Sequence, residues 1–427
     1  MPNRLFPGKM VFHLIDLLRG TSIMKALKEL HAHQYMPAGE LDALRKQRLE
    51  NLFKTAITSV PFYKNFNSYD ELPVLTKDMV IKHFNHFFLF PKKEGLSKKT
   101  TGGSTGVPFA YYTTRESVSY MWAGIILSWE MTGYKLGEKV VFLAGSSIFK
   151  NDWKHRLFYK LLNVDALYAS PLSDNIMYSY AEMIKDKKAA VLYGYSYAIN
   201  TMAEYLNRVN KHSFPELKGI VCTAELLTDS ARAKIEKAFG VPVYDQYGCN
   251  EGGISAFECE HKKMHLINTR AFYETNEDRA LISTDLNNDG FIMLKYNTTD
   301  IVEFDDKPCS CKRTFPVIKE MIGRLNDVVV DMDKKVLHAS FFGISLSKDS
   351  AIHQYQVTFN NESLTLNIHS DKDDETYFRE KYIPLISQYA RFDEYTVVMN
   401  APFEKTPNGK HREVVDKRKV KERVYTE

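Results

Sequence analysis

Between Lys139 and Gly248, short runs of apolar and β-branched residues alternate with longer amphipathic stretches. Such runs are typical of buried strands, and amphipathic stretches are typical of helices that cover a sheet. The alternation therefore predicts an α/β fold built from stacked strand–helix units. The predicted strands cover residues 140–143, 190–193, 219–222 and 241–244.

One predicted helix in this region has a clear beginning and end. It covers residues 228–239, where Thr228 can cap the N-terminus and Gly240 can end the helix. The strand that follows should deliver residues 247–251 to its carboxyl end. Ligands of such sheets bind at the carboxyl ends of the strands, so this position favours a binding role.

The pattern changes after Gly323. Alternating residues over 354–359 and 363–368 predict a hairpin, and a helix over 374–389 with a strand over 395–399 would complete a small α+β unit. We therefore predict two domains, a large one over residues 1–323 and a small one over 324–427. A small unit joined by a short hinge can close as a mobile lid that excludes water.

Composition agrees with two domains and excludes several classes of protein. The chain has 427 residues and 44% hydrophobic content, and its 57 basic against 53 acidic residues give no argument for a nucleic-acid partner. His13 and Asp16 interrupt the N-terminal apolar stretch, and the longest apolar run, near 121–129, is far shorter than the ~20 residues that cross a bilayer. We expect a cytoplasmic protein without membrane insertion.

The run T-T-G-G-S-T-G-V-P over residues 100–108 is the first candidate for chemistry. Glycine lets a backbone approach phosphate oxygens closely, and successive N–H groups with hydroxyl side chains can surround a polyanion. The run lacks the lysine of a Walker A loop, and by itself it is also compatible with a surface turn. The candidate ligands of a nucleotide triphosphate are Thr101, Gly102, Gly103, Ser104, Thr105 and Gly106.

Further motifs follow in a fixed order: Y-G-C-N-E-G-G at 247–253, Y-N-T-T-D at 296–300, G-R-L-N-D at 323–327 and K-T-P-N-G-K at 405–410. Earlier segments are V-P-F-Y-K at 60–64 and L-P-V-L-T-K at 72–77. This order resembles the adenylate-forming superfamily, and within it the phenylacetate-CoA ligase family and its capsular-polysaccharide-biosynthesis branch. The resemblance implies a large N-terminal domain of mixed sheets flanked by helices, with a small mobile α+β lid.

The resemblance also implies an ATP-dependent ligase. A carboxylate attacks the α-phosphorus of ATP, pyrophosphate leaves and an acyl-adenylate forms, a reaction that needs preplaced cations and N–H donors. The acyl group then passes to coenzyme A or, in the capsule branch, to an amine or hydroxyl of a sugar or other acceptor. A third interpretation is a nucleotide- and zinc-binding protein without catalysis. The expected partner is a small carboxylic acid, and a homodimer is a further possibility.

Individual roles come from the same resemblance. Tyr247 stacks on adenine, Glu251 coordinates Mg²⁺, and Asp300 accepts hydrogen bonds from both ribose hydroxyls. Lys410 bridges the substrate carboxylate and the α-phosphate. Taken singly, these residues are also compatible with a loop carboxylate, a strand-end cap or an exposed lysine. The remaining assignments are Gly248 and Asn250 (nucleotide motif), Arg324 (ribose or phosphate contact), Glu225 (wall of the adenine pocket, or an acid preceding a helix) and Asn326 (hinge).

Three positions depart from the family pattern. Asn250 stands where the family usually has Thr or Ser, Thr299 stands where it usually has Gly, and Asn326 stands where an acidic residue or lysine is common. These changes are compatible with adenylation. They leave the acceptor open between coenzyme A and other groups.

Cysteine usage suggests a second site. Of the five cysteines, Cys259, Cys309 and Cys311 combine with His265 as Cys-x5-His and Cys-x-Cys pairs, a set that suits tetrahedral zinc. The spacings differ from the commoner zinc-finger patterns, and a Cys-x-Cys pair can be incidental. Some members of the family have a metal here, which favours structural zinc. Disulfides are not expected in a cytoplasmic chain.

The sequence leaves the acid open. The aromatic residues of 193–197, with Trp122 and Trp129, would suit an aryl or apolar acid if they line the pocket. They are equally compatible with the hydrophobic core.

Overall fold

The computed structural model describes residues 8–92, 94–100, 109–145, 153–169, 172–210, 213–277, 279–324, 328–346, 349–405 and 411–418. The α-helices are α1 (Gly8–Arg19), α2 (Ile23–His33), α3 (Ala38–Ser59), α4 (Lys77–Lys82), α5 (Arg115–Glu130), α6 (Trp153–Leu161), α7 (Asp174–Asp186), α8 (Ser196–Val209), α9 (Asp229–Phe239), α10 (Ala339–Leu346) and α11 (Glu375–Ser387). Two short 3₁₀ helices are η1 (Pro61–Tyr63) and η2 (Phe84–Phe87).

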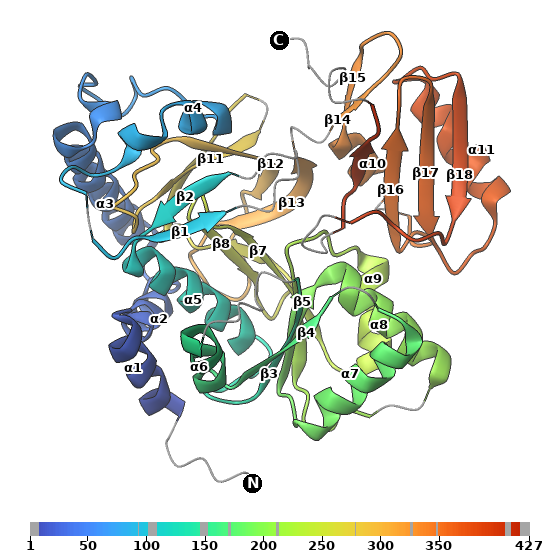
Figure 1. The fold of residues 1–427 in the computed structure, drawn as a ribbon, viewed down its shortest axis with the longest axis horizontal. Helices are drawn as coiled ribbons and strands as arrows, with labels where there is room; N and C mark the ends of the chain where they lie inside the picture. Colours follow the sequence, from blue (N-terminus) through green and yellow to red (C-terminus); the bar gives the residue numbers. More distant parts are fainter. Residues whose placement is uncertain are drawn as a thin grey trace.

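The strands belong to one large sheet, one smaller sheet and two hairpins (Figure 1). They are β1 (Ser97–Thr100), β2 (Ala110–Thr113), β3 (Val140–Ala144), β4 (Val164–Tyr168), β5 (Val191–Tyr195), β6 (Gly219–Thr223), β7 (Val243–Cys249), β8 (Ile254–Glu258), β9 (Met264–Leu266), β10 (Ala271–Thr275), β11 (Ala280–Asp285), β12 (Tyr296–Asp305), β13 (Val317–Arg324), β14 (Val328–Val330), β15 (Val336–His338), β16 (Gln354–Phe359), β17 (Ser363–His369), β18 (Glu394–Met399) and β19 (Val414–Asp416).

The large sheet has 11 strands in the order β10-β11-β12-β13-β9-β8-β7-β6-β5-β3-β4. Strands β3 to β7 pair in parallel, whereas β7 and all strands beyond it toward β10 pair antiparallel. The change occurs at the β7–β8 turn, within the 247–253 motif. The sequence therefore places its most distinctive motif where the sheet changes its pairing.

Both faces of the parallel half are buried, as expected for strands covered by helices on each side. On one face Phe142 and Tyr193 pack in a core with residues of α2 and α5, and on the other Leu143 and Leu192 pack with α8 and α9. Four of the aromatic residues considered for an acid pocket, Trp122, Trp129, Tyr193 and Tyr195, belong to these two cores, whereas Tyr197 does not. Trp129 is fully buried against Phe142 and Tyr193, so it is a core residue.

The C-terminal sheet is a separate small α+β domain with the strand order β18-β17-β16-β19 (Figure 1). The predicted hairpin is confirmed, with Phe359 opposite Leu364, and the predicted helix and strand correspond to α11 and β18. Strand β19, which pairs in parallel with β16, was not predicted. In the large domain, Thr228 accepts the Ala231 N–H at the start of α9 and Gly240 ends it in a left-handed conformation, as predicted.

Candidate functional site

The β7–β8 turn packs so closely that only glycine fits at two of its positions. A Cβ atom on Gly252 would lie 2.3 Å from Ser283 Oγ, and one on Gly253 would lie 2.4 Å from Asp285 Cβ. Gly253 also has φ +70°, a conformation that other residues rarely adopt. The glycines of the motif therefore fix the turn against β11, and the adjoining Glu251 is held in place.

Tyr247 and Asp300, predicted to contact the two ends of a nucleoside, lie together. The Tyr247 hydroxyl donates a 2.5 Å hydrogen bond to Asp300 Oδ2, and Asp300 is 3% exposed. Across the β12–β13 pair, Asp300 lies opposite Arg324, so the structure brings the backbones of these two predicted residues together. Motifs far apart in the sequence thus converge at the carboxyl end of β7.

Thr299 carries backbone strain beside Asp300. Its φ is +65°, in the left-handed region that is unfavourable for a β-branched residue. The family usually has glycine at this position, and the φ value gives the physical reason. Strain of this kind persists only where the surrounding structure imposes it.

Glu251 is partly buried, and its charge acts on Lys77 and Tyr111. Its negative charge partly offsets the effect of burial on Lys77, whose pKa is lowered. Burial, together with the charge of Glu251, raises the pKa of Tyr111 well above its usual value. The neighbouring Asn250 accepts a 3.3 Å hydrogen bond from Arg270 Nη2. Glu251 is therefore a partly buried carboxylate that can offer an oxygen ligand to a hard cation.

Glu225 joins the two domains. Its carboxylate accepts the backbone N–H of Tyr197 at 2.9 Å, at the start of α8, and that of His411 at 2.5 Å, in the C-terminal domain. Both interpretations made from the sequence placed it within the large domain alone. The contact with His411 could not be predicted, because it depends on how the C-terminal domain sits on the sheet.

The same interface contains aromatic and cationic contacts. The imidazole of His411 stacks on the Tyr197 ring at 5.8 Å with 7° between the planes, and Lys405 Nζ lies 3.9 Å from the centre of that ring. On the adjacent helix, Thr228 Oγ1 donates to the carbonyl of His353 at 3.0 Å. The C-terminal domain therefore covers the carboxyl ends of β5 and β6.

Three predicted parts of the site lie outside the described residues: the run Thr101–Gly106, the hinge residue Asn326 and Lys410. Their flanks are described. β1 ends at Thr100 and pairs with β2, with Lys99 opposite Tyr111, and His411 follows Lys410 directly. Of these flanking residues, Lys99 lines a cavity with Asn250, and the N–H of His411 binds Glu225.

Cys259, His265, Cys309 and Cys311 form the predicted cluster. Their possible ligand atoms all lie within 4.8 Å of one another, and all but Cys309 are buried. Cys259 Sγ is 3.7 Å from Cys309 Sγ, and Cys311 Sγ is 3.2 Å from His265 Nε2. The group joins the loop after β8 to the loop after β12.

The surroundings of these four residues fit a metal ion. His265 Nδ1 lies 2.9 Å from the Phe315 carbonyl, which fixes the ring with Nε2 toward the thiols, as second-shell partners do in metal sites. The backbone N–H groups of His261 and Arg313 point at Cys259 Sγ and Cys311 Sγ at 3.4 and 3.5 Å, contacts that suit thiolates. Burial lowers the pKa of His265, so its imidazole is neutral and can bind a metal.

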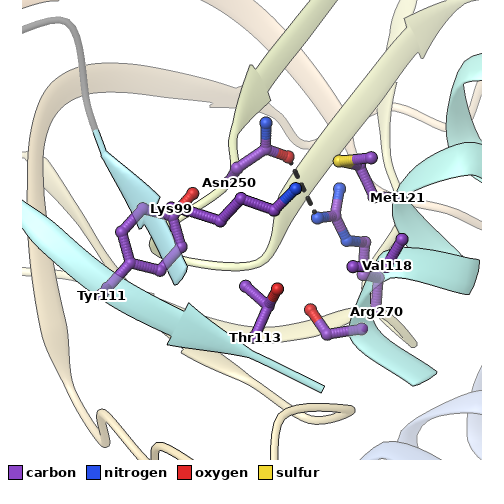
Figure 2. A pocket seen from close by; sticks show the side chains of 8 residues that line it. Lys99, Tyr111, Thr113, Val118, Met121, Asn250 and Arg270 are labelled. Carbon is purple, nitrogen blue, oxygen red and sulfur yellow. Dashed lines mark hydrogen bonds between the residues drawn. The ribbon is translucent and has the colours of Figure 1, made fainter. Parts of the chain in front are cut away.

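A small cavity beside Asn250 was not predicted. Its volume is about 60 Å³, and its lining includes Lys99, Thr113, Ser117 and Arg270 (Figure 2). No motif marks Arg270, which follows Asn268 and Thr269 in what looks like an ordinary polar turn. The available signal was the basic residue Lys99 next to the glycine-rich run.

Within the described part of the chain, no helix combines the length and the apolar character needed to cross a membrane.

No protein-family model matches the chain. The chain is 26% identical over 354 residues to protein CapK of Staphylococcus aureus, covering 76% of this chain and 78% of that protein. It is 23% identical over 379 residues to a phenylacetate-coenzyme A ligase of Thermus thermophilus, covering 81% and 84%. A solved structure of 2-hydroxyisobutyryl-CoA ligase in the postadenylation state, in complex with 2-HIB-AMP, matches with a TM-score of 0.67 at 17% identity, covering 90% and 91%.

These similarities confirm the resemblance that the motifs indicated. The chain is related to CapK and to phenylacetate-CoA ligases, and it has the fold of a CoA ligase, with a large mixed sheet and a small C-terminal domain.

Proposed function

We propose that the protein activates a carboxylic acid with ATP, forming an acyl-adenylate and releasing pyrophosphate. The observation that carries this proposal is the convergence of Tyr247, Asp300 and the turn bearing Glu251 at the carboxyl end of β7. Related ligases and the shared fold support it. In this proposal Asp300 and Arg324 bind the ribose, Tyr247 stacks on adenine, and Gly248 and Asn250 shape the turn beside the phosphates.

The reaction concentrates negative charge at the α-phosphorus, so donors and cations must be in place before attack. The run Thr101–Gly106 supplies N–H groups and hydroxyls to the β and γ phosphates. Glu251 would hold Mg²⁺, which neutralises phosphate charge when bound. Lys410 bridges the attacking carboxylate and the α-phosphate.

The C-terminal domain, residues 324–427 with a hinge at Asn326, acts as the lid in this proposal. Glu225 supports this role because it binds the N–H of His411, the residue directly after Lys410. Docking of the lid therefore brings the segment with Lys410 to the carboxyl ends of the strands. Closure also excludes water, which protects a reactive adenylate from hydrolysis.

The acceptor we propose first is coenzyme A, because the ligases similar to this chain are named for it. The similarity to CapK supports a second candidate, transfer to an amine or hydroxyl of a sugar or another acceptor. Release of AMP with coenzyme A as the sole acceptor would separate the two. A non-catalytic nucleotide-binding role predicts ATP binding without any acid-dependent reaction.

We propose zinc as the metal of the Cys259, His265, Cys309 and Cys311 cluster. Three thiolates and one imidazole complete a tetrahedral site with no open position for catalysis. Its role would then be structural.

The test of adenylation is acid-dependent exchange of pyrophosphate into ATP. We expect Lys410→Ala to lower exchange by at least about 100-fold, the scale of removing one transition-state donor. Lys417→Ala, an exposed lysine of the same domain, is the matched control and should retain the activity. Exchange that is equal in the two variants would reject the role of Lys410, and ATP binding without exchange for any acid would reject adenylation.

A further inference from the structure

The cavity beside Asn250 contains a buried cation that lacks an ion-pair partner among the described residues. Arg270 is 1% exposed, and its Nη1 donates to the Ile254 carbonyl at 2.9 Å and to Ser255 Oγ. Its Nη2 donates to Asn250, while its buried Nε has no acceptor in the described structure. A buried charge normally requires a counter-ion, so this side chain is incompletely compensated.

Asp285 is the acidic group whose charge acts most strongly on Arg270, but it forms no hydrogen bond with Arg270 in the described structure. Asp285 is also buried, but its oxygens accept hydrogen bonds from Ser117 Oγ at 2.5 Å and from the backbone N–H of Asn287 at 2.9 Å. Its charge favours the charged form of Arg270, but among the described residues the two side chains form no ion pair. Asp285 thus acts on Arg270 only at longer range, and an anion in the cavity would complete the compensation.

Lys99 brings a second cation to the same cavity. Figure 2 shows its side chain extending over Tyr111 toward Asn250 and Arg270. Its ammonium group adds positive charge to the space that the guanidinium of Arg270 faces. Lys99 lies on β1, the strand that leads into the glycine-rich run. This strand is next to the proposed site of reaction.

The volume and the lining of the cavity indicate which chemical group it can bind. Its volume of about 60 Å³ is well below that of the ~150 Å³ cavity that accommodates benzene. The cavity therefore suits a small group such as a carboxylate better than an aryl ring. Val118 and Met121 of α5 form an apolar wall, which suits a short carbon chain and distinguishes the cavity from a phosphate site made of N–H donors alone.

We infer that this cavity is the pocket for the tail of the acid, and that the substrate is a short acid carrying a second anionic group. Lys99 and Arg270 bind that second group, and Val118 and Met121 contact the chain between the two carboxylates. The inference rests on the proposed function. It changes the expected substrate from an aryl acid to a short dicarboxylic acid.

Pyrophosphate exchange with matched acids tests the inference. Succinate and butyrate have the same number of carbons but differ in the second carboxylate, and phenylacetate adds an aryl ring. We expect kcat/KM for succinate to exceed that for each of the other two by at least tenfold. Similar or better exchange with butyrate or phenylacetate would overturn the inference and leave adenylation established. Exchange with no acid, including those of a wider panel, would overturn adenylation and the inference together.

Substitution of Lys99 tests which ligand supplies the anion that the cavity binds, the acid or the phosphates of ATP. We expect Lys99→Met to raise KM for succinate at least tenfold with KM for ATP within about twofold of its original value. Lys98→Met is the matched control, because Lys98 is an exposed neighbour on the same strand, and it should change neither constant. An increase in KM for ATP alone would overturn the inference and assign the cavity to phosphate. Because Arg270 is fully buried, Arg270→Lys serves only as a second variant, with its unfolding temperature measured alongside.

Discussion

Two sets of contacts, here called junctions, flank the β7–β8 turn. The cysteine–histidine cluster joins two loops of the large sheet, and a second set joins the C-terminal domain to the large domain. The two junctions differ in how permanent they are. The Cys259–Cys311 junction has four ligand groups that converge within 4.8 Å, mostly buried. The lid junction consists of the Glu225–His411 hydrogen bond, the Tyr197 stack and a few contacts of α9. The first suits a fixed framework for Asp300, and the second suits a lid that must open to release products.

The energies of the two kinds of contact support this difference. A hydrogen bond contributes about 0.5–1.5 kcal/mol net, and about 1.5–3 kcal/mol when one partner is charged. Binding of structural zinc contributes about 10–16 kcal/mol in small peptides. On the proposed function, a lid held by a few hydrogen bonds would open during turnover, whereas a bound metal would keep the cluster closed.

The largest expected effect follows from breaking the cluster. We expect Cys311→Ser to lose bound metal and to lower the free energy of unfolding by at least about 3 kcal/mol, because loss of a metal is among the most destabilising changes. In a domain of this size that corresponds to a fall in Tm of roughly 6–12 °C. Metal analysis and calorimetry measure both quantities.

Cys222→Ala is the matched control for that variant, since Cys222 is equally buried but lies outside the cluster. It should leave the metal content unchanged. A Cys311→Ser protein that keeps its metal and its Tm would show that the cluster is not a metal junction.

The second-largest expected effect is on the rate of pyrophosphate exchange. Glu225→Ala removes the acceptor of two backbone N–H groups, one of them on the lid, and we expect pyrophosphate exchange to fall between about tenfold and 100-fold. The Tm should fall less than that of Cys311→Ser, because both domains keep their own cores. Glu216→Ala, an exposed carboxylate that precedes β6, should have no effect. If Glu225→Ala exchanges pyrophosphate normally, lid docking does not depend on this contact.

Much of the fold could be predicted because its signals are local. Thr228 and Gly240 define α9 through capping alone, and the alternation of 354–368 defines the β16–β17 hairpin. β19 has only three residues without alternation, so its pairing with β16 depends on the rest of the small domain.

The site shows the same division. Tyr247 and Asp300 could be singled out because each lies in a motif of consecutive residues. The cysteine cluster could be predicted because its members form two short pairs, Cys-x5-His and Cys-x-Cys. The role of Glu225 between the domains depends on docking, and the burial of Arg270 depends on β8 and β11 packing around a turn. Trp129 is a residue that the sequence could not assign, because composition does not distinguish an aromatic pocket from an aromatic core. In the structure it is a core residue.

The third prediction concerns the acid sensitivity of the lid junction. His411 Nε2 donates to the Tyr355 carbonyl at 2.8 Å, so its buried Nδ1 is unprotonated and without a partner in the described structure. Burial lowers the pKa of His411 to about 4. A lowered pKa means that the stability contributed by the neutral ring is complete above the ordinary pKa of about 6.5 and is lost as the pH falls toward 4.

His411→Gln keeps a donor for Tyr355 but cannot take up a proton. We expect its Tm to fall less than that of the original protein between pH 7.5 and 5.5, by a difference of roughly 2–4 °C for about 1 kcal/mol. Parallel Tm curves for the two proteins would mean that His411 does not titrate in this range.

The smallest expected effect concerns Thr299 of β12, on the side of the cysteine–histidine cluster. The surrounding structure holds this residue in an unfavourable backbone conformation. A non-glycine residue in the left-handed region costs about 1–2 kcal/mol, and glycine loses about 0.4–1 kcal/mol through the entropy of the unfolded chain. Thr299→Gly should therefore raise Tm by roughly 1–4 °C, with exchange activity retained because Asp300 keeps its place. Thr299→Ala retains a Cβ atom and should give no such gain. If Thr299→Ala stabilises the protein as much as Thr299→Gly, the threonine side chain and not the positive φ causes the strain. The surrounding structure would then impose less backbone strain on β12 than the φ of Thr299 indicates.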